Sequence, residues 1–281
     1  MIGTKRTAKA ITVGRFVASL VIAAMVIFPL YWMLLTALEP AAAMLSPVIE
    51  LLPTEGASFD AFVSAFLDMP TLLWLRNSAL ITIGATILSV FVSILAGYSL
   101  SRAHGAGHQA MGLTLLLARM IPGTLLVIPL YALFLNVGLV NNLWSLILIK
   151  TTIIVPFTTW MLKAFFDGIP RELEDSAYVD GASRLRALRS IVLPLSGPGI
   201  VAAVTYSAVL AWGDFLYART LLTADAKWPV TLGIVSFFGD NGTQWNSVMA
   251  VALVAIVPML LLFLFTERYL ISGLTAGAVK G

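Results

Sequence analysis

The sequence predicts an all-α membrane protein with six transmembrane helices and both termini on the cytoplasmic side. Hydrophobic residues make up 59% of the 281 residues, charged residues make up only 11%, and the mean hydropathy is +0.96. Apolar runs of about 20 residues recur, and each can cross a hydrocarbon core about 30 Å thick. A membrane β-barrel would instead need segments of about ten residues that alternate in polarity, and the sequence contains none.

Six spans are the most economical interpretation of this pattern. They cover Phe16–Leu38, Leu75–Leu100, Met111–Leu135, Leu143–Leu162, Pro198–Leu216 and Val248–Leu270. The first run is longer than the core of a signal peptide, which spans about 7–15 residues, so we expect it to remain as a span. The transmembrane domain is therefore predicted to cover residues 16–270, between an N-terminal tail of residues 1–15 and a C-terminal tail of residues 271–281.

Basic residues predict the orientation, because loops rich in Lys and Arg stay on the cytoplasmic side. With six spans, one side of the membrane receives Lys5, Arg6, Lys9, Arg15, Arg102, Lys163, Arg171, Arg184, Arg186, Arg189, Arg268 and Lys280. The other side receives Arg219 and Lys227, with Arg76 at a boundary. Both termini, and the long loop of about residues 163–196, are therefore expected in the cytoplasm.

This loop carries signals for two short helices joined by a turn. Pro170 suits a first helical position, and acidic residues follow it, where they complement the helix dipole. Gly181 can adopt the left-handed conformation that ends a helix, and Ser183 can cap the next one. The expected apolar face of the second helix is Leu185, Leu188 and Val192. Such a hairpin is either a docking surface for a partner outside the membrane or a solvated tether, and the number of start and stop signals favours docking.

The same loop resembles the cytoplasmic signature loop of the permeases of ATP-binding-cassette (ABC) importers. That pattern has an acid, two small residues, two spacers, Asp-Gly and a downstream Leu-Pro. Here it falls on Asp175, Ser176, Ala177, Asp180, Gly181 and Pro194. The chain departs from it with Asp-Ser-Ala in place of Glu-Ala-Ala, a change that keeps the charge and the small size.

The resemblance implies a type I importer permease fold, in which this loop is a coupling helix seated in a cleft of an ATPase subunit. The residues it assigns to ATPase coupling are Glu174, Asp175, Ser176, Ala177, Asp180, Gly181 and Ala182. The chain is expected to be a transport subunit and not an enzyme, since it lacks the phosphate-binding loop GxxxxGK[ST]. It would bind no cofactor directly, and ATP and Mg would belong to the partner ATPase.

Three further stretches are similar to the carbohydrate importers of the maltose type, in particular to their smaller, MalG-type permease. They are RMIPGTLLVIPLYALFLNVGLVNN, AWGDFLYARTLLT and ERYLISGLTAGAVKG. In that group the permease pairs with a second, different permease, two ATPase subunits bind below, and a substrate-binding protein docks outside. The implied function is to form half of the import pathway of a sugar or sugar derivative in a bacterial inner membrane.

Charged residues inside predicted spans mark a candidate substrate pathway, because a charge there costs several kcal/mol unless it faces a partner or a wet cavity. Arg119 lies just before Pro122-Gly123, where a helix can kink and expose its carbonyl groups. The candidate pathway residues are Arg119, Pro122, Gly123 and Asp214. One interpretation places Arg119 in the translocation cavity, where it would favour a sugar with an acidic, sulfonate or phosphate group. The other pairs it with Asp214 or a backbone carbonyl. Lys150 is expected to snorkel or to pair within the bundle.

Two other functions remain open from the sequence. A permease of the same architecture could carry another solute, such as glycerol phosphate. An ion-coupled secondary transporter or a membrane-embedded enzyme would need acids within its spans, whereas Asp and Glu cluster in the loops. Cys is absent, and His104 and His108 have no acids nearby, so no metal site is expected. No basic run with interleaved aromatic residues predicts nucleic acid, so the expected contacts are transporter subunits, sugar and membrane lipid.

Overall fold

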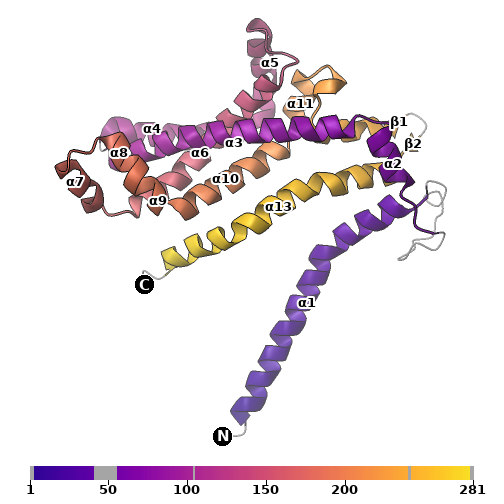
Figure 1. Cartoon of the computed structure of the whole chain (residues 1–281), viewed down its shortest axis with the longest axis horizontal. Helices are drawn as coiled ribbons and strands as arrows, with labels where there is room; N and C mark the ends of the chain where they lie inside the picture. The colour runs from indigo at the N-terminus through magenta and orange to yellow at the C-terminus, as the bar shows by residue number, and fades with distance from the viewer. Residues whose placement is uncertain (1–2, 41–55, 104, 240–241, 279–281) are drawn as a thin grey trace. The chain divides into compact units, whose positions relative to one another are not determined.

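The computed structural model describes residues 3–40, 56–103, 105–239 and 242–278, and most of them are helical (Figure 1). The helices are α1 (Gly3–Leu38), α2 (Asp60–Leu67), α3 (Thr71–Arg102), α4 (Ala106–Ala118), η2 (Gly123–Leu126), α5 (Val127–Asn136), α6 (Leu143–Asp167), α7 (Glu172–Val179), α8 (Arg184–Ala187), η3 (Leu188–Val192), α9 (Leu193–Leu195), α10 (Gly197–Trp212), α11 (Leu216–Leu221), η4 (Asp225–Lys227), α12 (Val230–Gly233), η5 (Ile234–Phe237) and α13 (Trp245–Ala278). Two short strands, β1 (Phe238–Gly239) and β2 (Gly242–Thr243), pair antiparallel. Apart from this ribbon, the regular structure of the described residues is helical, which confirms the predicted all-α class.

Within the described ranges, four helices are long and apolar enough to cross a membrane: α1, α3, α6 and α13. A fifth candidate is the pair Arg184–Leu195 and Gly197–Trp212, whose two helices meet at a bend of 83°. The helix at the predicted fifth span, α10, ends at Trp212 and not at Leu216. Helical structure also extends into both predicted tails, since α1 begins at Gly3 and α13 runs to Ala278.

The predicted third span, Met111–Leu135, is wrong as a single helix. α4 ends at Ala118, and helical structure resumes only at Gly123. Between them Pro122 is extended, with φ −57° and ψ 126°, and it has no N–H group for a helical hydrogen bond. The run therefore splits into α4 and the segment η2–α5, and α5 turns away from α3 and α6 (Figure 1).

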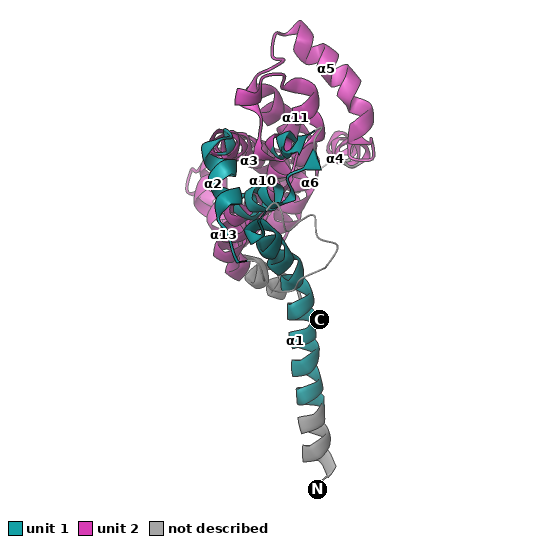
Figure 2. Cartoon of the chain, turned by 90° about the vertical axis from the view of Figure 1, so that its right-hand side faces the viewer, with its two compact units in different colours: residues 1–71, 234–256 teal, residues 72–233, 257–281 magenta. Residues whose placement is uncertain are grey.

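The chain divides into two units, coloured separately in Figure 2. The first comprises residues 1–71 and 234–256. Its buried cluster joins three small residues, Ala37 of α1, Ala61 of α2 and Ala250 of α13. Because these side chains are small, the three helices approach one another closely.

The second unit, residues 72–233 and 257–281, has a core in which α6 packs against both α3 and α10. Glycine permits both contacts. A Cβ atom at Gly97 of α3 would lie 3.1 Å from the carbonyl oxygen of Thr159, and one at Gly199 of α10 would overlap the ring of Phe165. Helices in lipid associate through such close packing, because the hydrophobic effect does not drive them together there.

α3 connects the two ends of the second unit. Near its start, Asn77 donates to the carbonyl oxygens of Ala226 and Trp228 at 2.9 and 3.0 Å. Near its end, Tyr98 and Arg102 contact α7. A helix rises about 1.5 Å per residue, so roughly 32 Å separate Asn77 from Tyr98 and roughly 38 Å separate it from Arg102. Both distances exceed a hydrocarbon core of about 30 Å. The segment before α12 and the α7 hairpin thus lie at opposite ends of a membrane-length helix.

The contact at Gly97 can be tested with a matched pair of substitutions. Gly97→Ala places a methyl group against the backbone of α6, and overpacking of this kind costs about 1–3 kcal/mol. A Cβ atom at Gly107, in α4, would meet nothing within 4 Å, so Gly107→Ala should leave stability unchanged or raise it slightly. Thermal unfolding of the detergent-solubilised protein should show a lower midpoint for Gly97→Ala only. Equal midpoints for the two variants would contradict the close packing.

Candidate functional site

The hairpin that follows α6 has the turn that the sequence predicts. Gly181 is left-handed, with φ 79°. Its N–H donates to the Tyr178 carbonyl at 3.0 Å, and the Ala182 N–H donates to the Ala177 carbonyl at 2.9 Å. These two bonds form a Schellman motif, which satisfies the last carbonyl groups of α7. Ser183 then caps the second helix by accepting from the Arg186 N–H at 3.3 Å. Both predicted roles are confirmed.

The second helix of the hairpin runs from Arg184 to Leu195 and contains a π-helical segment, η3. Leu188 and Val192, two residues of the expected apolar face, are buried in a core formed with α3 and α6. Leu185, the third residue of the expected apolar face, is 56% exposed. It lies about one turn nearer the tip than Leu188, outside the core that holds the other two residues.

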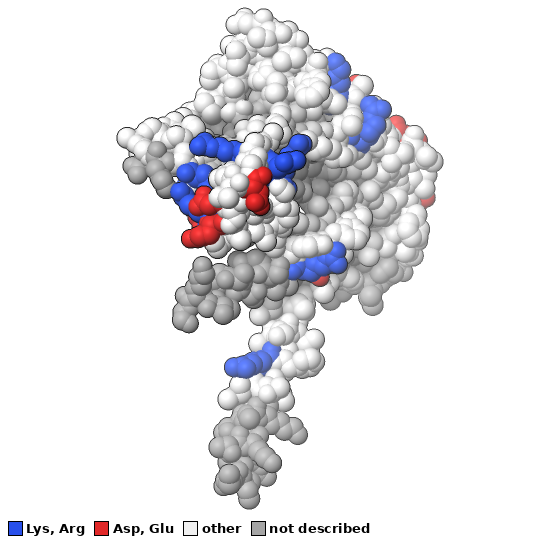
Figure 3. Space-filling model, turned by 60° about the vertical axis from the view of Figure 1, so that its left-hand side comes forward, with Lys and Arg blue, Asp and Glu red and all other residues white. Residues whose placement is uncertain are grey.

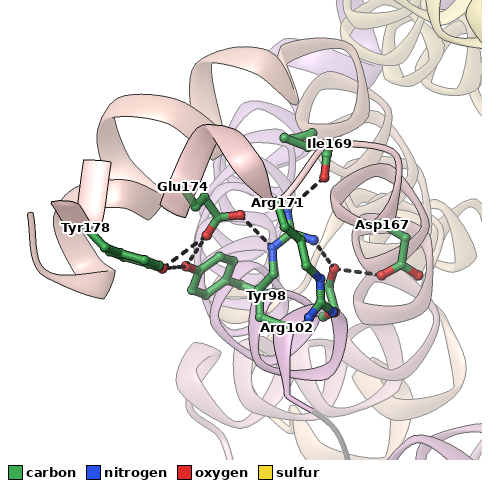
Figure 4. A network of polar contacts seen from close by, with 8 residues as sticks. Tyr98, Arg102, Asp167, Ile169, Arg171, Glu174 and Tyr178 are labelled. Carbon is green, nitrogen blue, oxygen red and sulfur yellow. Dashed lines mark hydrogen bonds and ion pairs between the residues drawn. The ribbon is translucent and has the colours of Figure 1, made fainter. Parts of the chain in front are cut away.

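A buried carboxylate ties α7 to the end of α3 (Figure 4). Glu174 is only 2% exposed. Its Oε1 accepts from Arg102 Nε at 2.6 Å, and its Oε2 accepts from the Tyr98 hydroxyl at 2.6 Å. The Tyr178 hydroxyl donates to the same Oε2 at 3.4 Å. Burial of a carboxylate is very costly unless it is paired and hydrogen-bonded, so these donors fix the position of α7.

A second set of contacts joins α3 to α6 and to the start of the hairpin (Figure 4). Ser101 donates to Asp167 Oδ1 at 2.7 Å and accepts from Arg102 Nη1 at 2.9 Å. Arg171 donates to the Ser101 carbonyl at 2.8 Å. The ion pair of Lys163 and Asp167, at 2.6 Å, is partly exposed and therefore contributes little by itself. The hairpin is thus connected to the ends of two long helices.

The tip of the hairpin faces outward. The exposed residues among those expected to couple to an ATPase are Asp175, Ser176, Asp180 and Gly181, and the half-buried ones are Ala177 and Ala182. Glu174 differs, because it contacts the chain's own α3. Val179, 88% exposed, adds apolar area next to the acids. Figure 3 shows Lys, Arg, Asp and Glu gathered at this end of the second unit.

A second candidate site is a cavity of about 540 Å³ in the second unit. It lies where the third predicted span is broken. Its lining includes Arg119, Gly123, Lys150, Thr152 and Tyr217. The structure therefore brings two of the four predicted pathway residues, Arg119 and Gly123, to one cavity.

Arg119 rests on two aromatic rings. Its Nη1 donates to the Tyr206 hydroxyl at 2.7 Å, and its guanidinium carbon lies 4.8 Å from the centre of the Phe157 ring. The two rings are themselves in contact, with centres 4.6 Å apart. Within the part of the chain that the structure describes, Arg119 forms no ion pair. The alternative prediction, in which Arg119 pairs with Asp214, is therefore wrong.

Asp214 pairs with Lys150 instead. The Lys150 Nζ lies 3.1 Å from Asp214 Oδ1, and the side chains are 8% and 13% exposed. Lys150 also donates to the Leu210 carbonyl at 3.3 Å, and Asp214 Oδ2 accepts from the Ala218 N–H at 3.2 Å. Lys150 thus pairs within the bundle, as one of its two predicted alternatives states, and both carboxylate oxygens of Asp214 are occupied.

The break at Pro122-Gly123 is held by Tyr217. The Tyr217 hydroxyl donates to the Gly123 carbonyl at 2.8 Å. One carbonyl freed by the helix break is therefore satisfied, as membrane-embedded irregular backbone requires.

Sequence reasoning did not assign Tyr98, Phe157, Tyr206 or Tyr217 to these sites. Their partners lie dozens of residues away, for example Glu174 for Tyr98, and no local motif marks such contacts. His104, one of the two histidines named from the sequence, lies outside the described residues.

Comparison with known proteins agrees with this arrangement. Residues 89–274 match the family model of the binding-protein-dependent transport system inner membrane component. The chain belongs to this family of transport permeases. Among similar curated permeases is the inner membrane ABC transporter permease YcjP of Escherichia coli K12, 32% identical over 91% of both chains.

Two more relatives of this permease cover nearly its whole length. The sulfoquinovosyl glycerol transport system permease SmoH of Agrobacterium fabrum is 34% identical over 95% of this chain and 93% of its own. The trehalose/maltose permease MalG of Thermococcus litoralis is 31% identical over 94% and 95%. A crystallised bacterial ABC transporter that imports the acidic polysaccharide alginate has a chain that superposes with a TM-score of 0.80 at 19% identity, over 94% of this permease and 98% of that chain. The permease fold expected from the signature loop is confirmed.

The anchoring role of Glu174 predicts a local change in the permease when its charge is removed. Glu174→Gln weakens two charge-assisted hydrogen bonds, each worth about 1.5–3 kcal/mol. Amide hydrogen exchange in α7 should therefore become roughly tenfold to a hundredfold faster. The control is Glu172→Gln, because Glu172 is exposed on the same helix. If exchange in α7 is the same in both variants, Glu174 is not the anchor.

Proposed function

We propose that this chain is a permease subunit of an ATP-driven, binding-protein-dependent importer of a sugar or sugar derivative, in which it forms half of the translocation pathway. The observation that carries the proposal is the hairpin, whose exposed acidic tip is fixed through Glu174 to the membrane-length helix α3. The curated relatives support the substrate class, since they include permeases named for maltose, diacetylchitobiose and arabinooligosaccharides. A non-sugar solute finds no such support among them.

The proposed topology has six spans with both termini in the cytoplasm. The contacts at the two ends of α3 support it, because they separate the α7 hairpin from the segment before α12 by more than the thickness of a hydrocarbon core. Lys and Arg gather at the hairpin end, which fits a cytoplasmic face. In this arrangement the broken segment α4–α5 is the third span and α10 is the fifth.

The proposed coupling works through the rigidity of the anchored hairpin. An ATPase bound to the tip would displace the whole hairpin. The residues proposed to contact the ATPase are Asp175, Ser176, Ala177, Asp180, Gly181 and Ala182. Glu174 would not contact the ATPase. It would transmit the displacement from α7 to α3 through its contacts with Arg102 and Tyr98. For the spans to switch between inward-open and outward-open states, the ATPase and the binding protein must each bind the two states with different affinity.

The proposed complex contains a second, different permease, two ATPase subunits and an extracytoplasmic substrate-binding protein. ATP and Mg would bind to the ATPase subunits, and this chain would bind no cofactor. The proposed substrate pathway includes Arg119, with the helix break at Pro122 and Gly123 beside it. Asp214 would contribute as the counter-ion that keeps Lys150 in place.

The topology predicts which introduced thiols react from outside. The chain contains no Cys, so single-Cys variants need no background changes. Val179→Cys lies at the hairpin tip and Thr223→Cys precedes η4, and both positions are exposed. A membrane-impermeant maleimide applied to intact cells or spheroplasts should label Thr223→Cys and leave Val179→Cys unlabelled until the membrane is opened. The reverse pattern would invalidate the orientation and, with it, the docking of an ATPase.

The docking surface predicts that charge reversal at the tip separates the subunits. The double variant Asp175→Lys, Asp180→Lys should lose most ATPase co-purification and ATP-driven uptake, because two acids of the tip become cations. Asp68→Lys is the control, since Asp68 is exposed at the end of α2 in the segment expected outside. If co-purification survives the double variant as well as it survives the control, the tip is not the ATPase contact.

A further inference from the structure

The charges around the cavity at the broken third span do not cancel. Lys150 and Asp214 form a nearly buried pair at 3.1 Å, so together they add no net charge. Arg119 also lines the cavity, and it has no acidic partner within the described ranges. The cavity therefore keeps one uncompensated positive charge at the depth of a predicted span, where such charges are costly unless they serve a polar path or a ligand.

The surroundings of Arg119 hold the guanidinium in place without neutralising it. Phe157 lies under it at 4.8 Å, a cation–π contact, and the Tyr206 hydroxyl accepts one of its N–H bonds. Arg119 itself is exposed, and it follows the last residue of α4, where the helix dipole favours a cation. A flexible side chain is thus positioned before any ligand arrives, which lowers the entropy that binding would otherwise cost.

The remaining donors suit an oxyanion. A guanidinium has five N–H groups, and only one donates within the described chain, to Tyr206. Because Tyr206 accepts that bond, its own O–H remains available as a donor beside the guanidinium. A planar fork with an adjacent hydroxyl matches a carboxylate or a sulfonate, which Arg binds through two parallel hydrogen bonds. A neutral sugar would leave the charge of Arg119 unmatched.

We propose that Arg119, with Tyr206 and Phe157, forms a subsite for the negatively charged substituent of an anionic sugar, a uronate or a sulfonate. This inference rests on the proposed function and names the substrate class for its pathway. Arg119 and Tyr206 contact the anion, and Phe157 positions the guanidinium. Lys150 is excluded from this contact, because its ammonium group is already held by Asp214 and the Leu210 carbonyl.

The test measures ATP-driven uptake by the complete transporter with matched pairs of sugars that differ only in their charged groups. Suitable pairs are digalacturonate with galactobiose, and sulfoquinovosyl glycerol with glucosyl glycerol. The wild-type complex should take up at least one anionic member in preference to its neutral counterpart. Arg119→Gln should reduce this preference about tenfold to a hundredfold, the effect of losing a charged hydrogen-bond pair. Tyr206→Phe should reduce it several-fold while keeping the ring.

Two control variants keep the result interpretable. Arg119→Lys retains the charge and should restore part of the preference that Arg119→Gln loses. Arg219→Gln removes an exposed Arg from α11, outside the cavity lining, and should leave the preference unchanged. The amount of assembled complex after size-exclusion chromatography shows whether each variant folds, and Tyr206→Phe provides an independent answer if Arg119→Gln does not assemble.

The outcomes separate the inference from the proposed function. Equal loss of both members of a pair in Arg119→Gln, or wild-type uptake of neutral members only, overturns the anionic subsite and leaves the sugar importer intact. Absence of ATP-driven uptake of any sugar by the wild-type complex contradicts the proposed function itself, and the subsite with it.

Discussion

The burial of one carboxylate controls the geometry of the hairpin. Glu174 is removed from water and is stable there only because Arg102, Tyr98 and Tyr178 donate to it. These donors come from α3 as well as from α7, so the hairpin cannot shift without moving the end of a membrane-length helix. The exposed acids at the tip are free to meet a partner because the buried acid on the same helix has already been satisfied internally.

The need to pair buried polar groups also applies within the membrane, where water is not available to hydrogen-bond a charge or a backbone group. Lys150 and Asp214 satisfy each other, and Tyr217 satisfies the carbonyl exposed by the break at Gly123. Arg119 is the exception among the charges placed around the cavity, since its partners are aromatic rings and one hydroxyl. Because the other charges at the cavity are paired, the unpaired charge of Arg119 is stronger evidence for ligand binding than a charge on a solvated surface would be.

Local signals allowed much of the hairpin to be predicted. Gly181 and Ser183 act through their own backbone and side chain, so their roles follow from residue type and spacing. The inward direction of Glu174 did not follow, because it depends on Tyr98 and Arg102 on a different helix. Hydropathy likewise placed the long helices but joined α4 to α5, since an average over apolar residues does not register that Pro122 is extended. The anionic option at Arg119 was visible from sequence, whereas the platform of Phe157 and Tyr206 required the packing of α6 against α10.

The bend at Ser196 has a mechanical consequence. The helices Arg184–Leu195 and Gly197–Trp212 form two arms that meet at 83°. A displacement along the axis of one arm therefore becomes a displacement across the axis of the other. Tyr206 lies on the second arm, roughly 15 Å from this pivot at a rise of about 1.5 Å per residue. The Ser196 hydroxyl is buried and makes no hydrogen bond within the described chain, so no side-chain bond locks the pivot. A displacement of Arg184–Leu195 would therefore become a sideways displacement of Tyr206, and with it of the subsite proposed for the anionic group.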